Sequence, residues 1–257
     1  MESEKSKSKK NEIRLLCTDL LEDSQLWHFW YGQMTSERRK KIDAFRFEKD
    51  KRLSLAAGIL LKTGIESNLG SEAEIPVHQG EHGKPFIRED LCFNLSHSGR
   101  IAVCAFSDLP VGVDIEENRH FEDSLIRYVY LEEEREAFLQ EGESDGIGSS
   151  LLKEDPEVVC TRMWTIKESV MKYYGTGISL APKRIRIDAM QADENLKGKY
   201  HSKVSIIGGL PSMDMTGPKP KDVFYITSWD LEGYQLSVCS EYKEFTNRPV
   251  FFDLETF

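Results

Sequence analysis

The stretch VGVDIE, residues 111–116, decides the fold of this chain. Apolar residues alternate along it with small or acidic ones, which is the pattern of a β-strand with one buried face. Its other face carries Gly112 and two carboxylates, Asp114 and Glu116. Like charges this close repel unless a proton or a cation lies between them, and a hard ion such as Mg²⁺ is the natural occupant. An ordinary edge strand with a solvent-facing side gives the same pattern, so the stretch alone leaves both interpretations open.

The same order of elements occurs on both sides of this stretch. Before it we expect, in chain order, a strand at 13–18, a basic helix starting near Thr35 or Ser36, a helix at 53–61, and strands at 91–95 and 101–106 joined by a polar turn at 96–100. After it we expect helices at 131–140 and 161–174 and strands at 184–188, 203–207, 223–229 and 235–240. The order predicts an α+β fold with two similar halves joined near 107–110, although no internal repeat proves a duplication.

The chain therefore divides into four expected parts. They are a disordered tail at 1–10, an N-terminal α+β subdomain at 11–109, a C-terminal α+β subdomain with the metal site at 110–240, and an extension at 241–257 that packs on the body. Two segments rich in turn-forming residues, 141–156 and 208–221, predict a mobile loop and a long hairpin loop.

Composition excludes several classes of protein. The 257 residues are 39% apolar and 30% charged, which is typical of a globular protein. No apolar run approaches the roughly 18 residues that cross a bilayer, and residues 1–10 lack the apolar segment of a secretion signal. A net charge of −10 makes non-specific nucleic-acid binding unfavourable. Five widely spaced cysteines without a Cys-x-x-Cys pair indicate a reducing cytoplasm.

The charge is unevenly placed along the chain. Residues 34–52 contain eight basic side chains against four acidic ones, and residues 131–145 contain seven acidic side chains against one basic. The first segment could hold an anion, and the second a metal or a cationic partner. Most such runs are solvated helix faces, and charge alone does not exclude that explanation here.

A second motif, WTIKESVMK at 164–172, lies in the expected helix 161–174. Trp164, Glu168 and Lys172 are four residues apart and so line one stripe of that helix. A further carboxylate and an ammonium would project together from it. Taken alone, the pair could equally be a surface salt bridge of about 0.3–0.5 kcal/mol.

A third motif combines Gly83-Lys84-Pro85 with FNLSHSGR at 93–100. The first part is not a P-loop, because no glycine precedes it by five positions and a proline replaces the Ser/Thr. Ser96 and His97 are adjacent, which is poor geometry for a nucleophile and its base, so a serine hydrolase is not favoured. As a polar turn, the segment could offer a hydroxyl, an imidazole and backbone N–H groups to a phosphate.

Taken in this order, GKP, FNLSHSGR, VGVDIE and WTIKESVMKYYGTGIS resemble the motifs of the Sfp-type 4'-phosphopantetheinyl transferases. The resemblance spans about residues 38–240. Glu168 follows Asp114 by 54 residues, slightly more than in the family, and the loop at 141–156 accounts for the excess. The resemblance implies two α+β subdomains related by a pseudo-two-fold, with coenzyme A bound in the cleft between them.

The resemblance also implies roles for individual residues. The Mg²⁺ ligands would be Asp114, Glu116 and Glu168. Lys172 would be the active-site lysine, and Glu134 the acidic residue of the intervening helix. The diphosphate and the 3'-phosphate of coenzyme A would be held by Lys84, Ser96 and His97. The basic set around the 3'-phosphoadenosine would be Arg38, Lys41 and Arg52, although Arg52 stands one place away from the usual arginine.

The implied reaction is attack by a serine hydroxyl of an acyl or peptidyl carrier protein on the β-phosphate of coenzyme A, releasing 3',5'-ADP. Lys172 and His97 would bear on the developing negative charge. Glu168 is the first choice for receiving the serine proton and Glu134 the second, although metal binding and proton acceptance compete at Glu168. We expect a cytoplasmic monomer with no nucleic-acid or membrane partner.

Two alternatives remain open from the sequence. One is a catalytically idle coenzyme A-binding module of the same fold, and the other is an acidic scaffold that binds partner helices through residues 131–140. Neither explains why the carboxylates cluster on one face in the family's order. The sequence does not identify the carrier protein.

Overall fold

The computed structural model describes residues 11–70, 76–80, 83–87, 91–138, 154–208, 221, 223–242, 245 and 248–255. The expected tail at 1–10 lies outside these residues, as do 141–153 of the expected mobile loop and 209–220 of the expected hairpin loop. No helix in the described part of the chain combines the length and the apolarity needed to cross a membrane.

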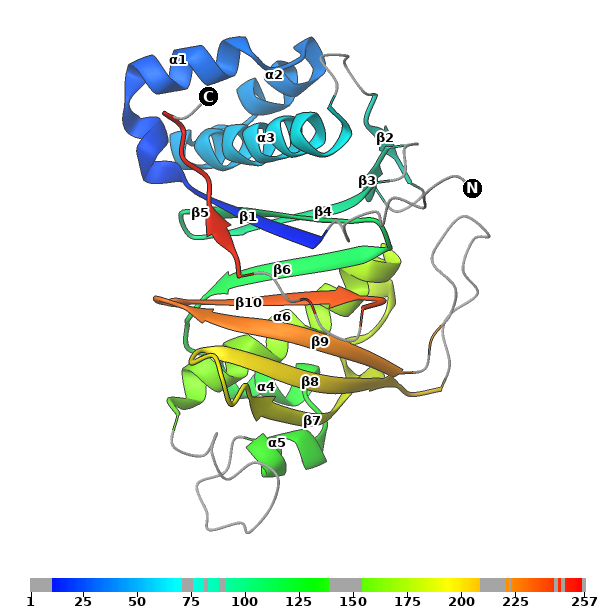
Figure 1. Cartoon of the computed structure of the whole chain (residues 1–257). Coiled ribbons are helices and arrows are strands. Elements are labelled where there is room, and N and C mark those ends of the chain that lie inside the picture. The colour runs from blue at the N-terminus through cyan, green and yellow to red at the C-terminus, as the bar shows by residue number, and fades with distance from the viewer. Residues whose placement is uncertain are drawn as a thin grey trace, which may run out of the picture.

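The N-terminal half contains helices packed on a mostly antiparallel sheet (Figure 1). Its elements are β1 (Asn11–Cys17), η1 (Thr18–Glu22), α1 (Ser24–Gly32), α2 (Ser36–Asp43), α3 (Glu48–Leu69), β2 (His78–Gln79), β3 (Pro85–Phe86), β4 (Cys92–Ser98) and β5 (Ile101–Ser107). The sheet order is β11-β1-β5-β4, and β2 and β3 form a small separate ladder.

The C-terminal half repeats this plan with a larger sheet. Its elements are β6 (Val111–Glu117), α4 (Asp123–Val129), α5 (Glu132–Phe138), α6 (Pro156–Tyr174), η3 (Gly177–Ser179), η4 (Pro182–Arg184), β7 (Ile185–Ala192), β8 (Lys199–Ile206), β9 (Val223–Leu231), β10 (Tyr234–Ser240) and β11 (Val250–Phe251). The sheet order is β6-β10-β9-β8-β7, and β11 joins the sheet of the N-terminal half.

The two halves share one connectivity. In the first, β1 pairs antiparallel with β5, and β5 with β4. In the second, β6 pairs antiparallel with β10, and β10 with β9. Each half places a long helix, α3 or α6, between its first strand and the later ones. The α+β class and the two-subdomain arrangement expected from the sequence are therefore confirmed.

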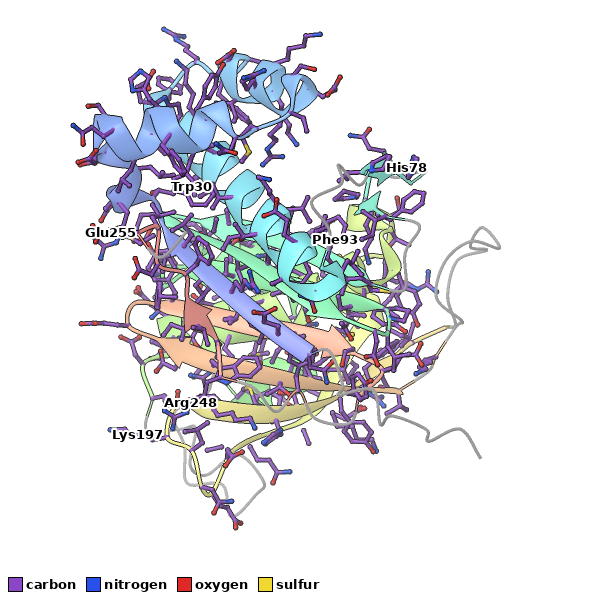
Figure 2. All side chains as sticks on the ribbon, turned by 45° about the horizontal axis from the view of Figure 1, so that its top comes forward. Trp30, His78, Phe93, Lys197, Arg248 and Glu255 are labelled. Atoms are coloured by element: carbon purple, nitrogen blue, oxygen red, sulfur yellow. The ribbon has the colours of Figure 1, made fainter. Side chains whose placement is uncertain are left out.

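Apolar residues of the described chain gather in three clusters, which define the layers. One lies between the N-terminal helices and their sheet and includes Leu55 and Phe93, of which Phe93 is labelled in Figure 2. One lies between the two sheets, and one between α6 and the second sheet. Val113 and Ile115 belong to the inter-sheet cluster, so the apolar face of residues 111–116 is buried as the alternation predicts.

Local signals in the sequence fix the ends of α6. Asp155 is its N-cap and accepts a hydrogen bond from the backbone N–H of Glu157, and Pro156 occupies the first turn. Gly175 ends the helix in the left-handed conformation with φ 71°, which glycine adopts without strain.

Gly112 lets α6 lie directly against β6. A Cβ atom at this position would stand 2.1 Å from the backbone oxygen of Ser169 and 2.3 Å from the backbone nitrogen of Tyr173. Any larger residue would push the helix away from the strand. The glycine next to the carboxylates therefore sets the distance between the two motifs that carry acidic side chains.

The C-terminal segment runs back over both halves. Phe245 is buried between the sheets, β11 pairs parallel with β1, and Leu254 is buried among the N-terminal helices. The ring of Phe252 meets Trp30 edge to face, with 6.2 Å between the ring centroids. Trp30 and Glu255 accordingly mark the same end of the molecule in Figure 2.

Some sequence expectations need correction. The turn expected at 96–100 is restricted to Gly99 and Arg100, because β4 continues through Ser98 and its ladder with β5 reaches that residue. The helix expected at 53–61 is part of the longer α3. Helices α1 and α4 were not expected from the sequence.

Candidate active site

The edge strands of the two sheets, β4 and β6, are joined by side chains rather than by a backbone ladder. The contacts come from every second residue of β4, and these residues share one face of the strand. Asn94 Oδ1 accepts from the Val113 backbone N–H at 2.8 Å, Ser96 Oγ donates to Asp114 Oδ1 at 2.8 Å, and Ser98 Oγ donates to Glu116 Oε2 at 2.8 Å. This joint places two carboxylates where the halves meet.

Lys172 of α6 completes a cluster with Ser96 and Asp114. Its Nζ donates to Asp114 Oδ1 at 2.5 Å and to Ser96 Oγ at 2.7 Å. Asp114 is buried, and its second oxygen, Oδ2, finds no hydrogen-bond partner in the part of the chain that the structure describes. A buried carboxylate oxygen without a donor is costly, so this atom indicates a place for a further positive group.

Glu168 faces the same cluster from α6. Burial raises its pKa to about 7, with the negative charges of Asp114 and Glu116 raising it further and Lys172 lowering it. The pKa of Glu116 is also raised, first by burial and then by Asp114. The three carboxylates thus share one electrostatic field, in which Lys172 and, at Glu116, Arg119 supply positive charge.

This donor set fits a hard divalent cation. Among the described residues, no His, Cys, Asp and Glu side chains already stand grouped as a metal centre. The buried Asp114 Oδ2 nevertheless lacks a donor, and burial together with neighbouring negative charge raises the pKa values of Glu116 and Glu168, so a cation with oxygen ligands would stabilise the ionised carboxylates here.

His97 connects the cluster with the basic N-terminal helices. The side chain is exposed at the surface of β4. Partial burial lowers its pKa and Lys172 lowers it further, while Asp50 raises it and Lys41 lowers it. The end of α2 and the first turn of α3 therefore lie within electrostatic reach of the imidazole, and Lys41 is exposed there. An anionic ligand could contact His97 and Lys41 together.

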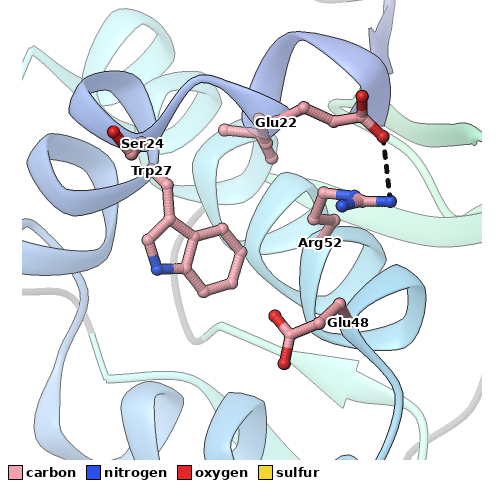
Figure 3. Close-up of a pocket in the computed structure, with 6 residues that line it drawn as sticks. Glu22, Ser24, Trp27, Glu48 and Arg52 are labelled. Carbon is pink, nitrogen blue, oxygen red and sulfur yellow. Dashed lines mark ion pairs between the residues drawn. The ribbon is translucent and has the colours of Figure 1, made fainter.

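The other basic residues predicted to hold coenzyme A have partners elsewhere; they are Arg38, Arg52 and Lys84. Arg38 donates through Nη2 to the backbone oxygen of Ser54 on α3. The guanidinium of Arg52 pairs with Glu22 at 3.1 Å, in a small pocket beside Trp27 (Figure 3). The structure does not bring Arg52 to the cluster, because its turn of α3 faces η1 and α1.

Lys84 lies at the other end of β6. Its Nζ donates to the backbone oxygens of Val111 at 3.1 Å and Tyr173 at 2.9 Å, and burial lowers its pKa to about 8. Tyr173 is in the last turn of α6, so this lysine satisfies a terminal carbonyl of that helix. In this structure Lys84 links the two halves and makes no contact with Ser96, Asp114 or Lys172.

The structure places Glu134 apart from this cluster. Its carboxylate is buried and accepts hydrogen bonds from Lys167 Nζ at 2.7 Å, from the Leu131 backbone N–H at 2.8 Å and from the Ile187 backbone N–H at 2.7 Å. The charges that act on Glu168 do not include Glu134. Both its oxygens are committed to the fold, so Glu134 is not placed to accept a substrate proton.

Sequence reasoning missed two contributors to the site, Asn94 and Ser98. Placing the second half of FNLSHS in a turn hid the fact that Asn94, Ser96 and Ser98 share one strand face. The period-two repeat of small polar residues was the available signal. It indicates a strand edge that bonds through side chains.

Comparisons with known proteins agree with this layout. A model of the 4'-phosphopantetheinyl transferase superfamily matches residues 110–207, and one described as 4'-phosphopantetheinyl transferase, N-terminal, matches residues 22–108. The chain is 27% identical over 229 residues to the 4'-phosphopantetheinyl transferase gsp of Aneurinibacillus migulanus, covering 89% of this chain and 85% of that protein.

Two further relatives have similar coverage. The 4'-phosphopantetheinyl transferase Sfp of Bacillus subtilis is 27% identical over 216 residues, or 82% of this chain and 84% of that protein. The L-aminoadipate-semialdehyde dehydrogenase-phosphopantetheinyl transferase of Schizosaccharomyces pombe is 26% identical over 243 residues, or 84% of this chain and 85% of that protein.

Proposed function

This chain belongs to the 4'-phosphopantetheinyl transferase superfamily and is an enzyme of that class, and from this premise we propose that it transfers the 4'-phosphopantetheine arm of coenzyme A to a serine of an apo acyl or peptidyl carrier protein. One observation carries the proposal. Asp114, with an unpartnered buried oxygen, lies against Lys172 and Ser96 at the joint between the halves and within the field of Glu116 and Glu168. Such an acidic site beside a lysine suits the handling of a metal-bound diphosphate.

The transfer exchanges one phosphorus–oxygen bond for another. The serine oxygen of the carrier bonds to the phosphorus that bears the pantetheine arm, and the bond from that phosphorus to the bridging oxygen breaks. The products are the phosphopantetheinylated carrier and 3',5'-ADP. The serine proton passes to a base of this chain.

Glu168 is the proposed base. Its pKa of about 7 leaves a substantial fraction of the carboxylate ionised at neutral pH while keeping it basic enough to accept a proton. Glu134 has no part in this role, because its carboxylate is fully engaged by Lys167 and two backbone N–H groups.

Lys172, Ser96 and His97 are proposed to orient coenzyme A. The Lys172 ammonium is partly exposed and would contact the diphosphate, while the Ser96 hydroxyl, which accepts from Lys172 and donates to Asp114, would hold that ammonium in position. His97 and Lys41 would hold the 3'-phosphate end of coenzyme A. Burial lowers the pKa of Lys41, and the positive charge of the nearby Arg38 lowers it further. Lys84 and Arg52 are left out of this set because their partners lie elsewhere.

A Mg²⁺ ion would be held by Asp114, Glu116 and Glu168. When bound, such an ion neutralises the charge that develops on a transferring diphosphate. The two roles proposed for Glu168 compete, since a carboxylate committed to a cation is a weaker base.

The direct test mixes the purified chain with coenzyme A and a panel of apo carriers from fatty-acid, polyketide and nonribosomal-peptide systems. We expect at least one carrier to gain the mass of the phosphopantetheine arm, and we expect a chelator to stop the reaction and Mg²⁺ to restore it. Coenzyme A binding without a mass shift on any carrier would leave a catalytically idle module instead. Transfer that is unaffected by chelation would remove the metal from the proposal.

A further inference from the structure

Ser98 is the last residue of β4 and bonds to the neighbouring strand β6 (Figure 1). Its Oγ donates to Glu116 Oε2 at 2.8 Å and accepts from the Glu117 backbone N–H at 3.1 Å. A backbone N–H can only donate, so the single hydroxyl proton of Ser98 is directed at the Glu116 carboxylate. Ser98 therefore holds one oxygen of this carboxylate and is itself held by the strand that carries it.

The contact repeats one that lies two residues earlier on both strands. Ser96 donates to Asp114 Oδ1 at 2.8 Å, the same distance as between Ser98 Oγ and Glu116 Oε2. In both cases the serine engages one carboxylate oxygen. The other oxygen of Asp114, Oδ2, has no partner among the described residues, and within that part of the chain Ser98 is the one hydrogen-bond donor to Glu116. Each serine thus leaves the second oxygen of its carboxylate open.

The turn that follows Ser98 fixes its position. A Cβ atom at Gly99 would stand 2.5 Å from the hydroxyl oxygen of Tyr234 and 2.7 Å from a carboxylate oxygen of Glu117, so the turn lies directly against the ends of β10 and β6. The Arg100 backbone N–H also donates to the Tyr234 hydroxyl at 3.2 Å. Ser98 cannot move away from Glu116 unless this closely packed turn moves with it.

Glu116 depends on such a contact more than Asp114 does. Asp114 has the shorter side chain and accepts hydrogen bonds from both Ser96 and Lys172. Glu116 has one more rotatable bond and, in the described structure, Ser98 alone to orient it. Residues that hydrogen-bond to a metal-ligating carboxylate orient it, and their loss lowers metal affinity about 10- to 100-fold.

We propose that Ser98 is a positioning residue for the divalent cation. It binds Glu116 Oε2 and so keeps the carboxylate turned into the site, with the other oxygen available as a ligand. The inference rests on the proposed function only in its assignment of Glu116 to the cation. Ser98 touches neither substrate nor metal in this role and acts through Glu116.

The primary test measures metal binding without any carrier protein. Mn²⁺ serves as the probe because it takes the same oxygen ligands as Mg²⁺, and the electron paramagnetic resonance signal of the free ion reports its binding to the purified chain. We expect Ser98→Ala to weaken Mn²⁺ binding about tenfold or more. In transfer assays the Mg²⁺ concentration for half-maximal rate should rise by a similar factor, while kcat at saturating Mg²⁺ changes less than about twofold.

Two variants control for structural damage. Ser98→Thr retains the hydroxyl and should bind Mn²⁺ within about threefold of the natural chain. Ser205→Ala removes a serine that donates to a carboxylate outside the site, Asp188 Oδ1 at 3.0 Å, and should leave Mn²⁺ binding unchanged. Thermal melting shows whether each protein folds. Ser98→Cys, which keeps the size of the side chain with only a weak donor, takes the place of Ser98→Ala if the latter is unfolded.

A double-variant cycle tests whether Ser98 acts through Glu116. In a Glu116→Ala chain, the further change Ser98→Ala should leave Mn²⁺ affinity within about twofold, because the carboxylate that Ser98 orients is already absent. An equal loss of affinity with and without Glu116 would overturn the inference, since Ser98 would then act on the cation by another route.

The remaining outcomes separate this inference from the proposed function. If the natural chain binds Mn²⁺ and Ser98→Ala binds it equally well, Ser98 does not position the ligand, whereas the proposed transfer is unaffected. If no carrier is modified, the proposed transfer fails, and the Mn²⁺ affinities of the natural chain and of Ser98→Ala still decide the role of Ser98. A natural chain that binds no Mn²⁺ would overturn the inference outright.

Discussion

Two lysines of helix α6 pair with carboxylates of neighbouring elements, and the two pairs differ in how many of their polar atoms have a hydrogen-bond partner. Lys167 and Glu134 are 0% and 1% exposed, and Lys167 Nζ also donates to the backbone oxygens of Val129 and Pro182. Lys172 and Asp114 are 28% and 3% exposed, and Asp114 Oδ2 lacks a partner among the described residues. The first pair joins α6 to its surroundings, whereas the second keeps bonding capacity for something outside the chain.

The difference shows why proximity of a lysine and a carboxylate is not by itself a sign of chemistry. When a buried ion pair makes all its remaining hydrogen bonds to the backbone, it helps to specify one folded structure. No donor or acceptor of such a pair is then free to bind a substrate. A pair whose lysine reaches solvent and whose buried carboxylate has one oxygen unpaired, with two further carboxylates nearby, is in the opposite condition. Four predictions break or sharpen this contrast.

Breaking the buried pair of Lys167 and Glu134, here the core pair, should have the largest effect on stability. The substitution Glu134→Ala leaves the Lys167 ammonium buried without its counter-charge and should reduce the free energy of unfolding by about 3–5 kcal/mol. Lys172→Ala should cost less, because the ammonium is already partly in solvent and the Asp114 carboxylate that remains keeps the hydrogen bond from Ser96. Urea unfolding of both variants measures the contrast, and equal losses would show that the two pairs do not differ in kind.

Removing charge from the pair of Lys172 and Asp114, here the site pair, should lower the rate of the reaction rather than the stability. Asp114→Asn should lower kcat for transfer by about 10²–10³-fold, the usual loss when one preorganised electrostatic group is removed. The matched change Asp188→Asn on β7, where the carboxylate contacts Arg186, should leave kcat unaltered. Transfer rates with a fixed carrier measure both, and an active Asp114→Asn enzyme would refute the assignment of the site.

Gly112→Ala tests whether the spacing between α6 and β6 matters to the site pair. The new Cβ would lie 2.1 Å from the backbone oxygen of Ser169, so α6 must shift, and we expect a loss of about 1–3 kcal/mol in unfolding free energy together with slower transfer. Gly32→Ala is the control, since no atom lies within 4 Å of the added carbon. Full activity and stability in Gly112→Ala would mean that the helix position is not critical.

The smallest effect concerns pH. The pKa of Glu168 is raised from 4.5 to about 7 in the folded protein, so between these values the folded state binds more protons than the unfolded state. Its contribution to stability is therefore fully present below about pH 4.5 and is lost as the pH rises through about 7. Metal-free chain unfolded at pH 5 and pH 8 should show this decline, and Glu168→Gln should reduce it. An unaltered pH profile in Glu168→Gln would contradict the environment described for this carboxylate.

Local pattern was enough to predict the strand at 111–116 and the stripe of Glu168 and Lys172. The alternation places Asp114 and Glu116 on one strand face, and the four-residue spacing places Glu168 and Lys172 on one helix face. Both deductions need only the geometry of an isolated element. The family resemblance added their meeting point. In the structure Lys172 Nζ donates to Asp114 Oδ1, and the charges of both residues act on Glu168.

Other residues could not be placed in this way. Lys84 and Arg52 are basic residues in suitable segments, yet one caps α6 and the other pairs with Glu22. Glu134 stands in an acidic run that looks solvated, but α5 turns it inward to Lys167. In each case the direction of a long side chain depends on which element packs beside it, and sequence spacing carries no information about that neighbour.

The sequence by itself determined the two α+β halves, the identity of the acidic and basic groups, and the face of the strand or helix on which each lies, because these follow from backbone periodicity. Only the tertiary structure decided which lysine–carboxylate pair is buried and complete and which is left open. That outcome depends on the packing of β4 against β6 and of α6 against Gly112, where contacts between residues far apart in the chain determine which polar atoms find a partner.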